Sequence, residues 1–453
     1  MVARRYEIDM SKGSILKNML LFAFPLMLSN ILQLLYNAAD QIVVGRWGGE
    51  ECLAAVGATG TLTTLLTNLF VGLSIGASVA VSKKYGAQDI FGLRNTTHTA
   101  VALGLIGGIA TCIIGQLVCK PVLVLMDTPK EVLPLSVLYV RIIFLGTPAQ
   151  IVYNFGAAIL RSVGDTKRPL YILSVTGIVN VALNLLLVIG FHMDVAGVAI
   201  ATVTAHYLSA AAIMYSLINS DTPYRINLKA LKIHKDEAKQ IASVGIPAGL
   251  QSCMFTFANM VVQSAVNSFG SATMAGRTAG ASIEGFVYTS MDAFYQATIT
   301  SVGQNYGAKQ EKRIYKTIRT GMLCAGITGI VLGLLVYIFK EPLLSLYIVN
   351  SPTSIREGVV YITMCGLPYF ICGIMNVTTG ALRGLGHSKA PAINSLIGAC
   401  GFRLLWIFFV LPYNHTTWFL YLCWPISWLV VIIMNSVNFM IVRKKSIEKM
   451  YVQ

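Results

Sequence analysis

The chain has 453 residues, of which 55% are hydrophobic and only 12% carry a charge. Water-exposed domains carry about 25% charged residues, so the composition excludes a soluble globule of this length, and also a disordered chain. Lys and Arg number 34 against 19 Asp and Glu, which gives a net charge of +15. Because the basic residues lie between long apolar runs, the composition is typical of a multi-pass membrane protein rather than a nucleic-acid-binding protein.

Twelve apolar stretches are long enough to cross a bilayer as helices, which takes about 20 residues each. In chain order they cover 15–44, 54–81, 97–119, 133–159, 169–191, 195–217, 239–267, 275–303, 319–339, 357–381, 392–412 and 417–442. These runs are continuously apolar rather than alternating, which favours helices over the strands of a membrane barrel. The sequence therefore predicts an all-α integral membrane protein with twelve spans.

The polar connections between these stretches alternate in charge. Basic residues gather before the first span, in every second connection and after the last span, at 4–17, 83–94, 161–168, 225–239, 309–319, 383–389 and 443–449. Loops rich in Lys and Arg stay in the cytoplasm, so we expect a protein of the cytoplasmic membrane with both termini cytoplasmic. This orientation requires an even number of spans, and it explains the basic excess without a nucleic-acid partner.

The chain repeats itself at an offset of about 222 residues. Matching segments are Leu160–Pro169 with Leu382–Pro391, at five of ten positions, and Tyr85-Gly86-Ala87 with Tyr306-Gly307-Ala308. Six spans in each repeat is an even number, so both halves enter from the same side and form parallel repeats. We expect two pseudo-symmetric six-helix lobes, 1–218 and 239–453, joined by a cytoplasmic linker at 219–238. Two such bundles enclose a central cleft that they expose alternately, as in a secondary transporter.

Two repeat-related prolines are candidate hinges. Pro25 in the first span has its counterpart in Pro247 of the seventh, and Pro148 has its counterpart in Pro368. A proline removes one backbone hydrogen bond and permits a kink in a helix. We therefore expect Pro25 and Pro247 to let the first span of each half bend.

Polar side chains follow one face of three apolar helices. Gln33, Tyr36, Asn37 and Asp40 are spaced i, i+3, i+4 and i+7 in the first span, Asn180 and Asn184 share a face of the fifth, and Thr202 lies in the sixth. An ionisable group at membrane depth is costly and is by default a functional candidate. Carboxylate, amide and hydroxyl oxygens suit a hard cation such as Na⁺, or a protonatable carboxyl group. The alternative is that Asp40 simply reaches lipid headgroups or solvent at the outer interface.

The eighth span carries a second polar row. Glu284, Tyr288 and Asp292 are successive i+4 neighbours, so they share one helix face. They are candidates for binding protons or a cationic substrate. The alternative is a helix that faces a water-filled cleft with its charges merely solvated.

Several classes of chemistry have no sequence support. The chain contains no G-x-x-x-x-G-K-[ST] phosphate loop and no metal or nucleophile–base motif. We therefore expect no enzymatic activity, no cofactor and no bound metal beyond a coupling ion, and transport energised by an ion gradient. G-x-x-x-G pairs occur at Gly72/Gly76, Gly245/Gly249 and Gly329/Gly333. They are predicted to pack helices closely.

The chain resembles the multidrug and toxic compound extrusion (MATE) family over nearly its whole length. The resemblance is carried by Pro25–Asp40, Val44-Gly45-Arg46, Ala54-Ala55-Val56-Gly57, Tyr85-Gly86-Ala87 and the Leu160–Asp165 loop. It implies twelve spans in two six-helix lobes around a V-shaped central cleft. It also implies antiport by rocker-switch alternating access, in which organic cations and drugs leave in exchange for H⁺ or Na⁺.

The resemblance also assigns an ion site. In the family branch with this site in the N-terminal lobe, the matching residues here are Asp40, Asn180, Asn184 and Thr202. The position of Asn184 is often a second Asp in the family, so this chain lacks one carboxylate and H⁺ and Na⁺ both stay open. Another branch uses acids on the seventh and tenth spans; here the seventh has none, and Asn376 stands in the tenth.

Two other functions remain as alternatives. A flippase of lipid-linked or amphiphilic metabolites has a related fold, but an anionic cargo calls for clustered arginines. Arg141, Arg277 and Arg403 form no evident cluster in the sequence, and acids are present. Charge complementarity therefore favours small, amphiphilic, cationic substrates. The other alternative is a receptor or an enzyme that transports nothing. We expect the protein to act as a monomer.

Overall fold

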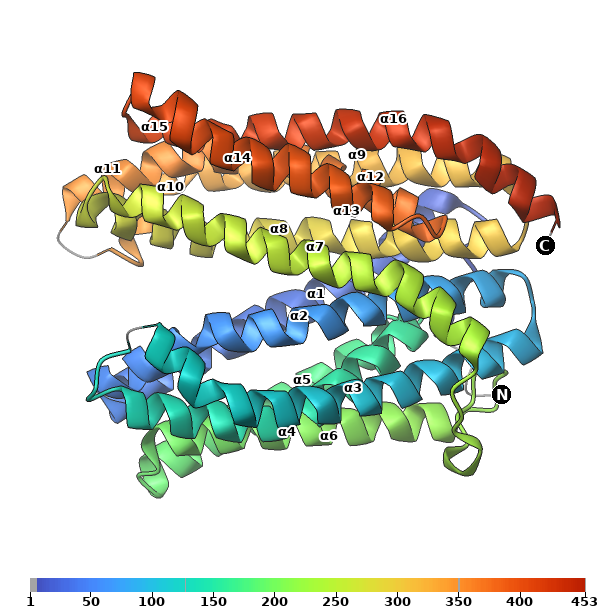
Figure 1. Cartoon of the computed structure of the whole chain (residues 1–453), viewed down its shortest axis with the longest axis horizontal. Coiled ribbons are helices and arrows are strands. Elements are labelled where there is room, and N and C mark those ends of the chain that lie inside the picture. The colour runs from blue at the N-terminus through green and yellow to red at the C-terminus, as the bar shows by residue number, and fades with distance from the viewer. Residues whose placement is uncertain (1–5, 127, 349–350, 453) are drawn as a thin grey trace. The chain divides into compact units, whose positions relative to one another are not determined.

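The computed structural model describes residues 6–126, 128–348 and 351–452, which form helices and loops without a strand (Figure 1). The α-helices are α1 (Ile15–Val43), α2 (Glu50–Gly86), α3 (Ile90–Leu125), α4 (Leu133–Ser162), α5 (Lys167–Asn184), α6 (Asp194–Ile218), α7 (Lys235–Asn267), α8 (Ser271–Gly307), α9 (Glu311–Ile338), α10 (Lys340–Ser345), α11 (Pro352–Tyr361), α12 (Tyr369–Gly384), α13 (Lys389–Ser395), α14 (Phe402–Leu405), α15 (Thr417–Tyr421) and α16 (Cys423–Val452). π-Helical turns lie at η2 (Val44–Gly48), η3 (Leu185–Gly190), η5 (Ile362–Gly366), η6 (Leu396–Gly401) and η7 (Trp406–Val410). Short 3₁₀ turns lie at η4 (Leu228–Ala230) and η8 (Leu411–Tyr413).

The membrane-spanning character of the helices is confirmed. Among the described residues, ten helices are long and apolar enough to cross a bilayer, or eleven if a bent pair forms one span. The remaining predicted span, 275–303, falls in α8, which is long enough but more polar. Several polar side chains of α8, among them Glu284, Thr298 and Gln304, are buried inside the protein. These side chains meet other helices and not lipid, so α8 can lie within the membrane although it is less apolar.

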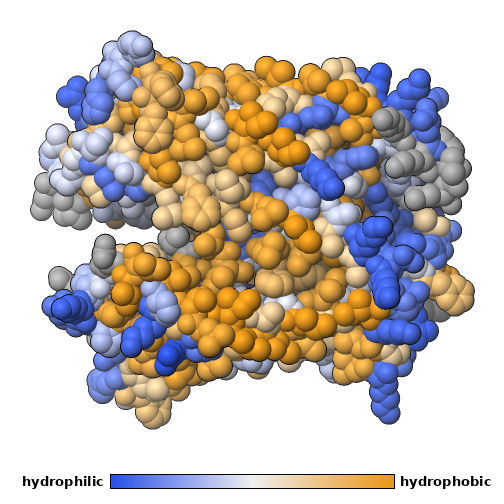
Figure 2. Space-filling model, viewed as in Figure 1, coloured by the Kyte–Doolittle hydropathy of each residue, from blue (hydrophilic) through white to orange (hydrophobic). Residues whose placement is uncertain are grey.

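The surface has the distribution expected in a bilayer. Figure 2 shows hydrophobic residues over the middle of the helices and hydrophilic residues gathered toward their ends. Many large apolar side chains are exposed on the surface of the protein. Leu117, for example, is 72% exposed and Phe24 is 70% exposed. Water-soluble monomers rarely expose contiguous apolar area on this scale, so the surroundings of these helices are lipid.

The chain divides into two compact units. Unit 1 comprises Met1–Asp9 and Leu28–Gly249, and unit 2 comprises Met10–Met27 and Leu250–Gln453. Both boundaries inside a long helix fall two residues after a proline, Pro25 in α1 and Pro247 in α7. Each of these helices therefore packs in two different units along its length. The lobes predicted from the repeat, 1–218 and 239–453, stay a prediction.

Glycines permit close helix packing within each unit, as predicted. In unit 1, a Cβ atom on Gly72 of α2 would lie 2.2 Å from the backbone nitrogen of Gly249 on α7, and Gly76 meets Gly245 in the same way. In unit 2, a Cβ atom on Gly329 of α9 would lie 2.6 Å from a backbone carbon of α12. These helices touch backbone to backbone, so the G-x-x-x-G pairs serve packing.

The predicted tenth span, 357–381, is broken rather than continuous. Pro352–Gly366 and Tyr369–Gly384 meet at a bend of 40°. The break lies at Pro368, which has no N–H to donate and which follows the π-helical turn η5. Its repeat counterpart Pro148 lies inside α4 without a break. The same residue thus has different effects in the two halves because its helical context differs.

Alternate connections gather at one end of each unit. In unit 1, the Glu7 carboxylate accepts hydrogen bonds from Tyr85 at the end of α2 (3.1 Å) and from Tyr224 in the linker (2.8 Å). In unit 2, Ser446 near the C-terminal end of α16 pairs with His387 in the α12–α13 connection (2.9 Å). The basic connections within each unit therefore lie together, as their alternation along the chain predicts.

Candidate functional site

The first helix is held against the fifth by Tyr36. Gly177 of α5 leaves room for the Tyr36 ring, which a Cβ atom at that position would overlap. The Tyr36 hydroxyl donates a hydrogen bond to the backbone carbonyl oxygen of Ser174, at 3.2 Å. Asp40 lies one helical turn further along α1, on the same face. The packing of Tyr36 therefore directs Asp40 toward α5.

The four residues assigned to the ion site come together in unit 1. Asn184 Nδ2 donates a short hydrogen bond to Asp40 Oδ1, and Thr202 Oγ1 donates to Asp40 Oδ2 at 3.4 Å. Asn184 Nδ2 also lies 3.4 Å from Asn180 Oδ1. Asn180 and Asn184 are buried, so this contact takes place away from bulk solvent. Helices α1, α5 and α6 each contribute at least one side chain.

The site contains two groups whose bonding capacity is not met by the protein. Among the described residues, no Lys, Arg or His forms an ion pair with Asp40. Asn184 Oδ1 is buried and has no hydrogen-bond partner there. An ionised carboxylate at membrane depth without a cation beside it is costly. The site therefore has the chemistry to take up a proton or a small cation.

The Asn184 amide can meet Asp40 with either of its polar atoms, and the two ligands favour different orientations. Asn184 presents its NH₂ group to the carboxylate, an arrangement suited to an ionised acid without a metal ion. A cation bound to Asp40 would favour the opposite amide orientation, which brings Asn184 Oδ1 to the ion together with Thr202 Oγ1. Within the described part of the chain, no three His, Cys, Asp or Glu side chains form a metal cluster.

The helical geometry changes immediately beyond the site. α5 ends at Asn184 and continues as the π-helical turn η3, and α1 continues as η2 four residues after Asp40. π-Helical turns within α-helices are frequent at functional sites. Buried valines from both turns, with neighbours on α6, form an apolar cluster: Val43, Val44, Val188, Val195 and Val198. This cluster therefore lies at the end of α1, just beyond Asp40 in the chain.

Tyr139 is a neighbour of the site that the sequence did not reveal. It lies on α4, packs against the valine cluster, and is near enough to Asp40 for the carboxylate to act electrostatically on its hydroxyl. A single tyrosine in an apolar run has no distinguishing pattern. Its position depends on the packing of α4 against α6, which periodicity within α4 does not indicate.

The polar row on α1 does not act as one surface. Tyr36 and Asp40 are partly buried against α5 and α6, whereas Gln33 and Asn37 are exposed. No hydrogen bond links Gln33 or Asn37 to Asp40 among the described residues. They remain candidates for contacting cargo and do not belong to the Asp40 hydrogen-bond cluster.

The row on α8 is likewise divided. Glu284 is buried in unit 2 and accepts a short hydrogen bond from the Tyr361 hydroxyl. Tyr288 is 39% exposed, and its ring meets Tyr369 edge to face at 6.4 Å. Asp292 is partly buried. Glu284 therefore belongs to the interior of unit 2, while Tyr288 reaches its surface.

Two arginines of unit 2 lie against the same tryptophan, a contact that the sequence did not reveal. Arg277 of α8 and Arg403 of α14 both lie over the ring of Trp424, at 5.7 and 5.4 Å from its centroid. Arg403 Nε also donates to Ser427 Oγ at 3.1 Å. The two arginines are far apart in the sequence and approach the same ring only because α8 and α14 both lie against α16 near Trp424. Arg141, in unit 1, is exposed and takes no part.

Known proteins resemble this chain in both sequence and structure. A family model described as MatE matches residues 25–186 and 247–409. "Probable multidrug resistance protein YoeA" from Bacillus subtilis is 28% identical over 399 residues, covering 86% of each chain. "Probable multidrug resistance protein YpnP" from the same organism is 28% identical over 414 residues, covering 91% of this chain and 90% of that one.

A solved structure has the same fold. It is described as the outward-facing conformation of a multidrug resistance MATE family transporter of the MOP superfamily, with a TM-score of 0.89, 21% identity and 99% coverage of both chains. At that identity the likeness concerns the fold alone. The family model, which spans both halves of the repeat, goes further: the chain belongs to the MatE family of multidrug and toxic compound extrusion transporters.

Proposed function

We propose that the protein is a secondary active antiporter that exports small amphiphilic organic cations, drugs among them, in exchange for H⁺ or Na⁺. Family membership and the names of the relatives YoeA and YpnP support drug efflux. One observation carries the ion coupling: Asp40 is held by Asn184 and Thr202, and no cation within the described chain balances its charge. The acids of the two polar rows favour a cationic cargo.

Neutralisation of Asp40 is the step that couples ion to cargo. An ionised Asp40 needs the Asn184 and Thr202 donors, and these bonds hold α1 against α5 and α6. When H⁺ or Na⁺ binds, the cost of the bare carboxylate disappears and α1 is free to pack differently. Pro25 removes one backbone hydrogen bond within α1, so the helix can bend there.

The membrane potential adds to the ion gradient when each cycle carries more positive charge inward with the coupling ions than leaves with the cationic cargo. One net positive charge moving inward across 100 mV provides about 2.3 kcal/mol. That energy shifts a two-state equilibrium by roughly fiftyfold. Cargo and coupling ion then stabilise different states and compete through the conformational equilibrium.

We further propose that the protein is a monomer in the cytoplasmic membrane with both termini in the cytoplasm. The basic connections lie together in each unit, and such connections stay on the cytoplasmic side. Family members of this kind need no cofactor besides the coupling ion.

Competition between ion and cargo tests the proposal. Binding of a fluorescent organic cation to the purified full-length protein in nanodiscs is measured while pH and Na⁺ are varied separately. Cargo affinity should fall as the coupling ion increases, and Asp40→Asn should remove this dependence. Asp221→Asn makes the same chemical change on an exposed linker residue and should behave as wild type. Equal affinity at every pH and Na⁺ concentration would contradict the proposal.

Flippase activity toward an anionic amphiphile is the second candidate, and one observation favours it. Arg277 and Arg403 both lie over Trp424, which places two cationic groups around one ring of unit 2. Glu284 lies in the same interior and offsets part of that charge. Transbilayer movement of a fluorescent anionic lipid in proteoliposomes separates the two functions. A flippase should accelerate this movement, whereas an antiporter should give the same rate as liposomes without protein.

A further inference from the structure

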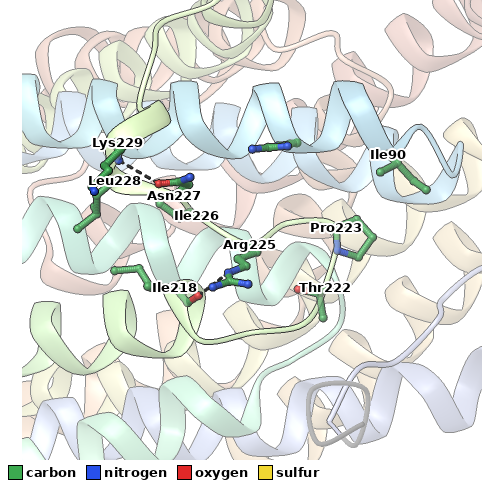
Figure 3. Close-up of a pocket in the computed structure, with 10 residues that line it drawn as sticks. Ile90, Ile218, Thr222, Pro223, Arg225, Ile226, Asn227, Leu228 and Lys229 are labelled. Atoms are coloured by element: carbon green, nitrogen blue, oxygen red, sulfur yellow. Dashed lines mark hydrogen bonds between the residues drawn. The ribbon is translucent and has the colours of Figure 1, made fainter.

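A pocket lies where α3, α6 and the linker meet in unit 1. Its volume is about 680 Å³, and its walls include Ile90 and Arg94 of α3, the last residue of α6, Ile218, and the loop from Thr222 to Lys229 (Figure 3). Three cationic side chains contribute to it, from Arg94, Arg225 and Lys229, and no acidic residue of the described chain lines it. The pocket is therefore strongly basic, although its residues come from separate parts of the chain.

These cationic groups are available to a ligand. Arg225 Nε donates to the backbone carbonyl oxygen of Ile218 at 2.9 Å, which fixes the plane of the guanidinium and leaves its terminal N–H groups free. Lys229 is held only through its backbone, whose N–H donates to Asn227 Oδ1 at 3.1 Å. Neither the Arg94 nor the Lys229 side chain forms an ion pair within the described residues. A fixed guanidinium fork is well suited to a phosphate group.

The loop that forms the pocket is pre-organised. Tyr224 and Ile226 are both fully buried and anchor the loop on either side of Arg225. The backbone N–H of Asn227 donates to His98 Nε2 at 3.1 Å, and His98 Nδ1 lies 2.8 Å from the Arg94 carbonyl oxygen. His98 therefore links the loop to the helix that carries Arg94. The pocket exists before a ligand arrives, so binding orders few residues.

The pocket lies at the boundary of the membrane. Candidate spans begin at Ile90 and end at Ile218, and both residues line it. Exposed apolar side chains accompany the basic groups: Ile90 and Leu228 are each 59% exposed, and Phe91 is 81% exposed. Basic pockets between spans on the cytoplasmic side are the sites that bind anionic lipid headgroups. A small soluble anion would make no contact with these exposed apolar side chains, whereas a lipid would cover them.

We propose that this pocket binds the phosphate-bearing headgroup of an anionic phospholipid. Arg94, Arg225 and Lys229 contact the phosphate, and the exposed apolar residues Ile90 and Leu228 lie against the lipid's glycerol and acyl region. The bound lipid ties the linker to the start of α3. This site is separate from the Asp40 cluster, so its test does not depend on the proposed transport function.

Lipid binding to matched variants tests the proposal. Full-length protein is titrated with phosphatidylglycerol, phosphatidylcholine or inorganic phosphate, and retained lipid is counted by native mass spectrometry. The pocket variant is Arg94→Gln/Arg225→Gln/Lys229→Gln. The control, Lys232→Gln/Lys235→Gln/Lys239→Gln, removes equal charge from exposed positions of the same linker region. A milder variant, Arg94→Lys/Arg225→Lys, keeps the charge and guards against misfolding of the triple variant.

The proposal has distinct outcomes. Wild type should prefer phosphatidylglycerol, and the pocket variant should lose affinity on the order of tenfold or more, while the control changes by less than about twofold. The milder variant should still prefer phosphatidylglycerol over phosphatidylcholine but bind it more weakly than wild type, because Lys keeps the charge and lacks the guanidinium fork. Equal losses in the pocket and control variants would show diffuse charge attraction and overturn the site. Displacement of the lipid by inorganic phosphate at equal concentration would also overturn it, because the site would then bind a small anion.

Discussion

Asp40 depends on partners that are remote in the sequence. Its two hydrogen bonds come from Asn184 and Thr202, 144 and 162 positions away. The site contains one carboxylate and two side-chain donors, so its preference between H⁺ and Na⁺ is set by how many oxygens it can present. Asn184 determines that number, because its amide can present either NH₂ or Oδ1 to the ion.

Changing Asn184 to Asp should therefore shift the ion preference toward Na⁺. A second carboxylate adds a charged oxygen ligand, and affinity for hard cations rises with ligand charge, so we expect Na⁺ to bind about tenfold more tightly. The measurement is the Na⁺ dependence of cargo binding at fixed pH. Asn219→Asp places the same acid at an exposed position after the end of α6 and should have no effect. An unchanged Na⁺ dependence in Asn184→Asp would show that this position does not contact the ion.

The ion site could be predicted only in part from the sequence. Asp40 stands out because a carboxylate in an apolar helix is rare, and the helical spacing pairs it with Tyr36. The association of Asp40 with Asn184 came from family resemblance. Tyr139 and the Arg277–Trp424–Arg403 contact could not be predicted, because both depend on which helices pack together and at what rotation.

Helix ends and helix contacts determine stability at the scale of elements. α3 begins after Asp89, whose carboxylate accepts a hydrogen bond from the Gly92 N–H at 2.9 Å and lies 3.1 Å from Lys84 Nζ. α2 and α7 touch through Gly72 and Gly249 without intervening side chains. The spans themselves were predictable, because each is a long apolar run. The bend at Pro368 was not, because Pro148 sits in an unbroken helix.

Removal of the α3 cap should destabilise the protein in a pH-dependent way. The Gly92 N–H, helped by Lys84, lowers the pKa of the Asp89 carboxyl from its ordinary value of 3.8. The ionised form therefore stabilises the fold above that value, and its contribution is lost as pH falls through the lowered pKa. Asp89→Ala should cost about 1 kcal/mol at neutral pH, seen as a lower unfolding temperature in detergent.

The variant Asp89→Asn separates the contribution of the capping hydrogen bond to stability from that of the negative charge. Asn accepts the same hydrogen bond, so this variant should retain most of the stability at neutral pH. The deficit of Asp89→Ala should shrink as the pH is lowered toward 3. If Asn is as destabilising as Ala, the cap does not operate as described.

The α2–α7 contact predicts opposite effects for two glycines on one helix. A Cβ atom at Gly72 would overlap the α7 backbone, so Gly72→Ala should destabilise the protein by about 1–3 kcal/mol. A Cβ atom at Gly60 would have no other atom within 4 Å. Gly60→Ala should therefore be neutral or stabilise α2 by up to about 1 kcal/mol. Thermal unfolding in detergent measures both. Equal behaviour of the two variants would show that α7 does not approach α2 so closely.

The whole molecule is organised by its repeat and by two helices that each belong to both compact units. The repeat was visible in the sequence, and it predicted paired bundles. The passage of α1 and α7 from one unit to the other was not predictable, since a sequence match does not reveal where along a helix its partners change. That this passage follows Pro25 and Pro247 supports the proposed role of both prolines as hinges.

Orientation in the membrane is a property of the whole molecule and can be tested by labelling. The nine native cysteines are buried or partly buried, and they are replaced before the test. Lys232→Cys in the linker should react with an impermeant maleimide in inverted vesicles and not in intact cells. Tyr413→Cys, at an 89% exposed position between the last two predicted spans, should show the reverse. Labelling of Lys232→Cys from outside would overturn the orientation.

Transport in proteoliposomes, with pH and Na⁺ gradients imposed separately, tests the central claim most directly. Wild-type protein should accumulate a fluorescent organic cation against its gradient when at least one of the two ion gradients is present. Asp40→Asn, reconstituted to the same level and equally folded, should lose this gradient-driven accumulation, whereas Asp221→Asn should retain it. Full gradient-driven transport by Asp40→Asn would contradict the account.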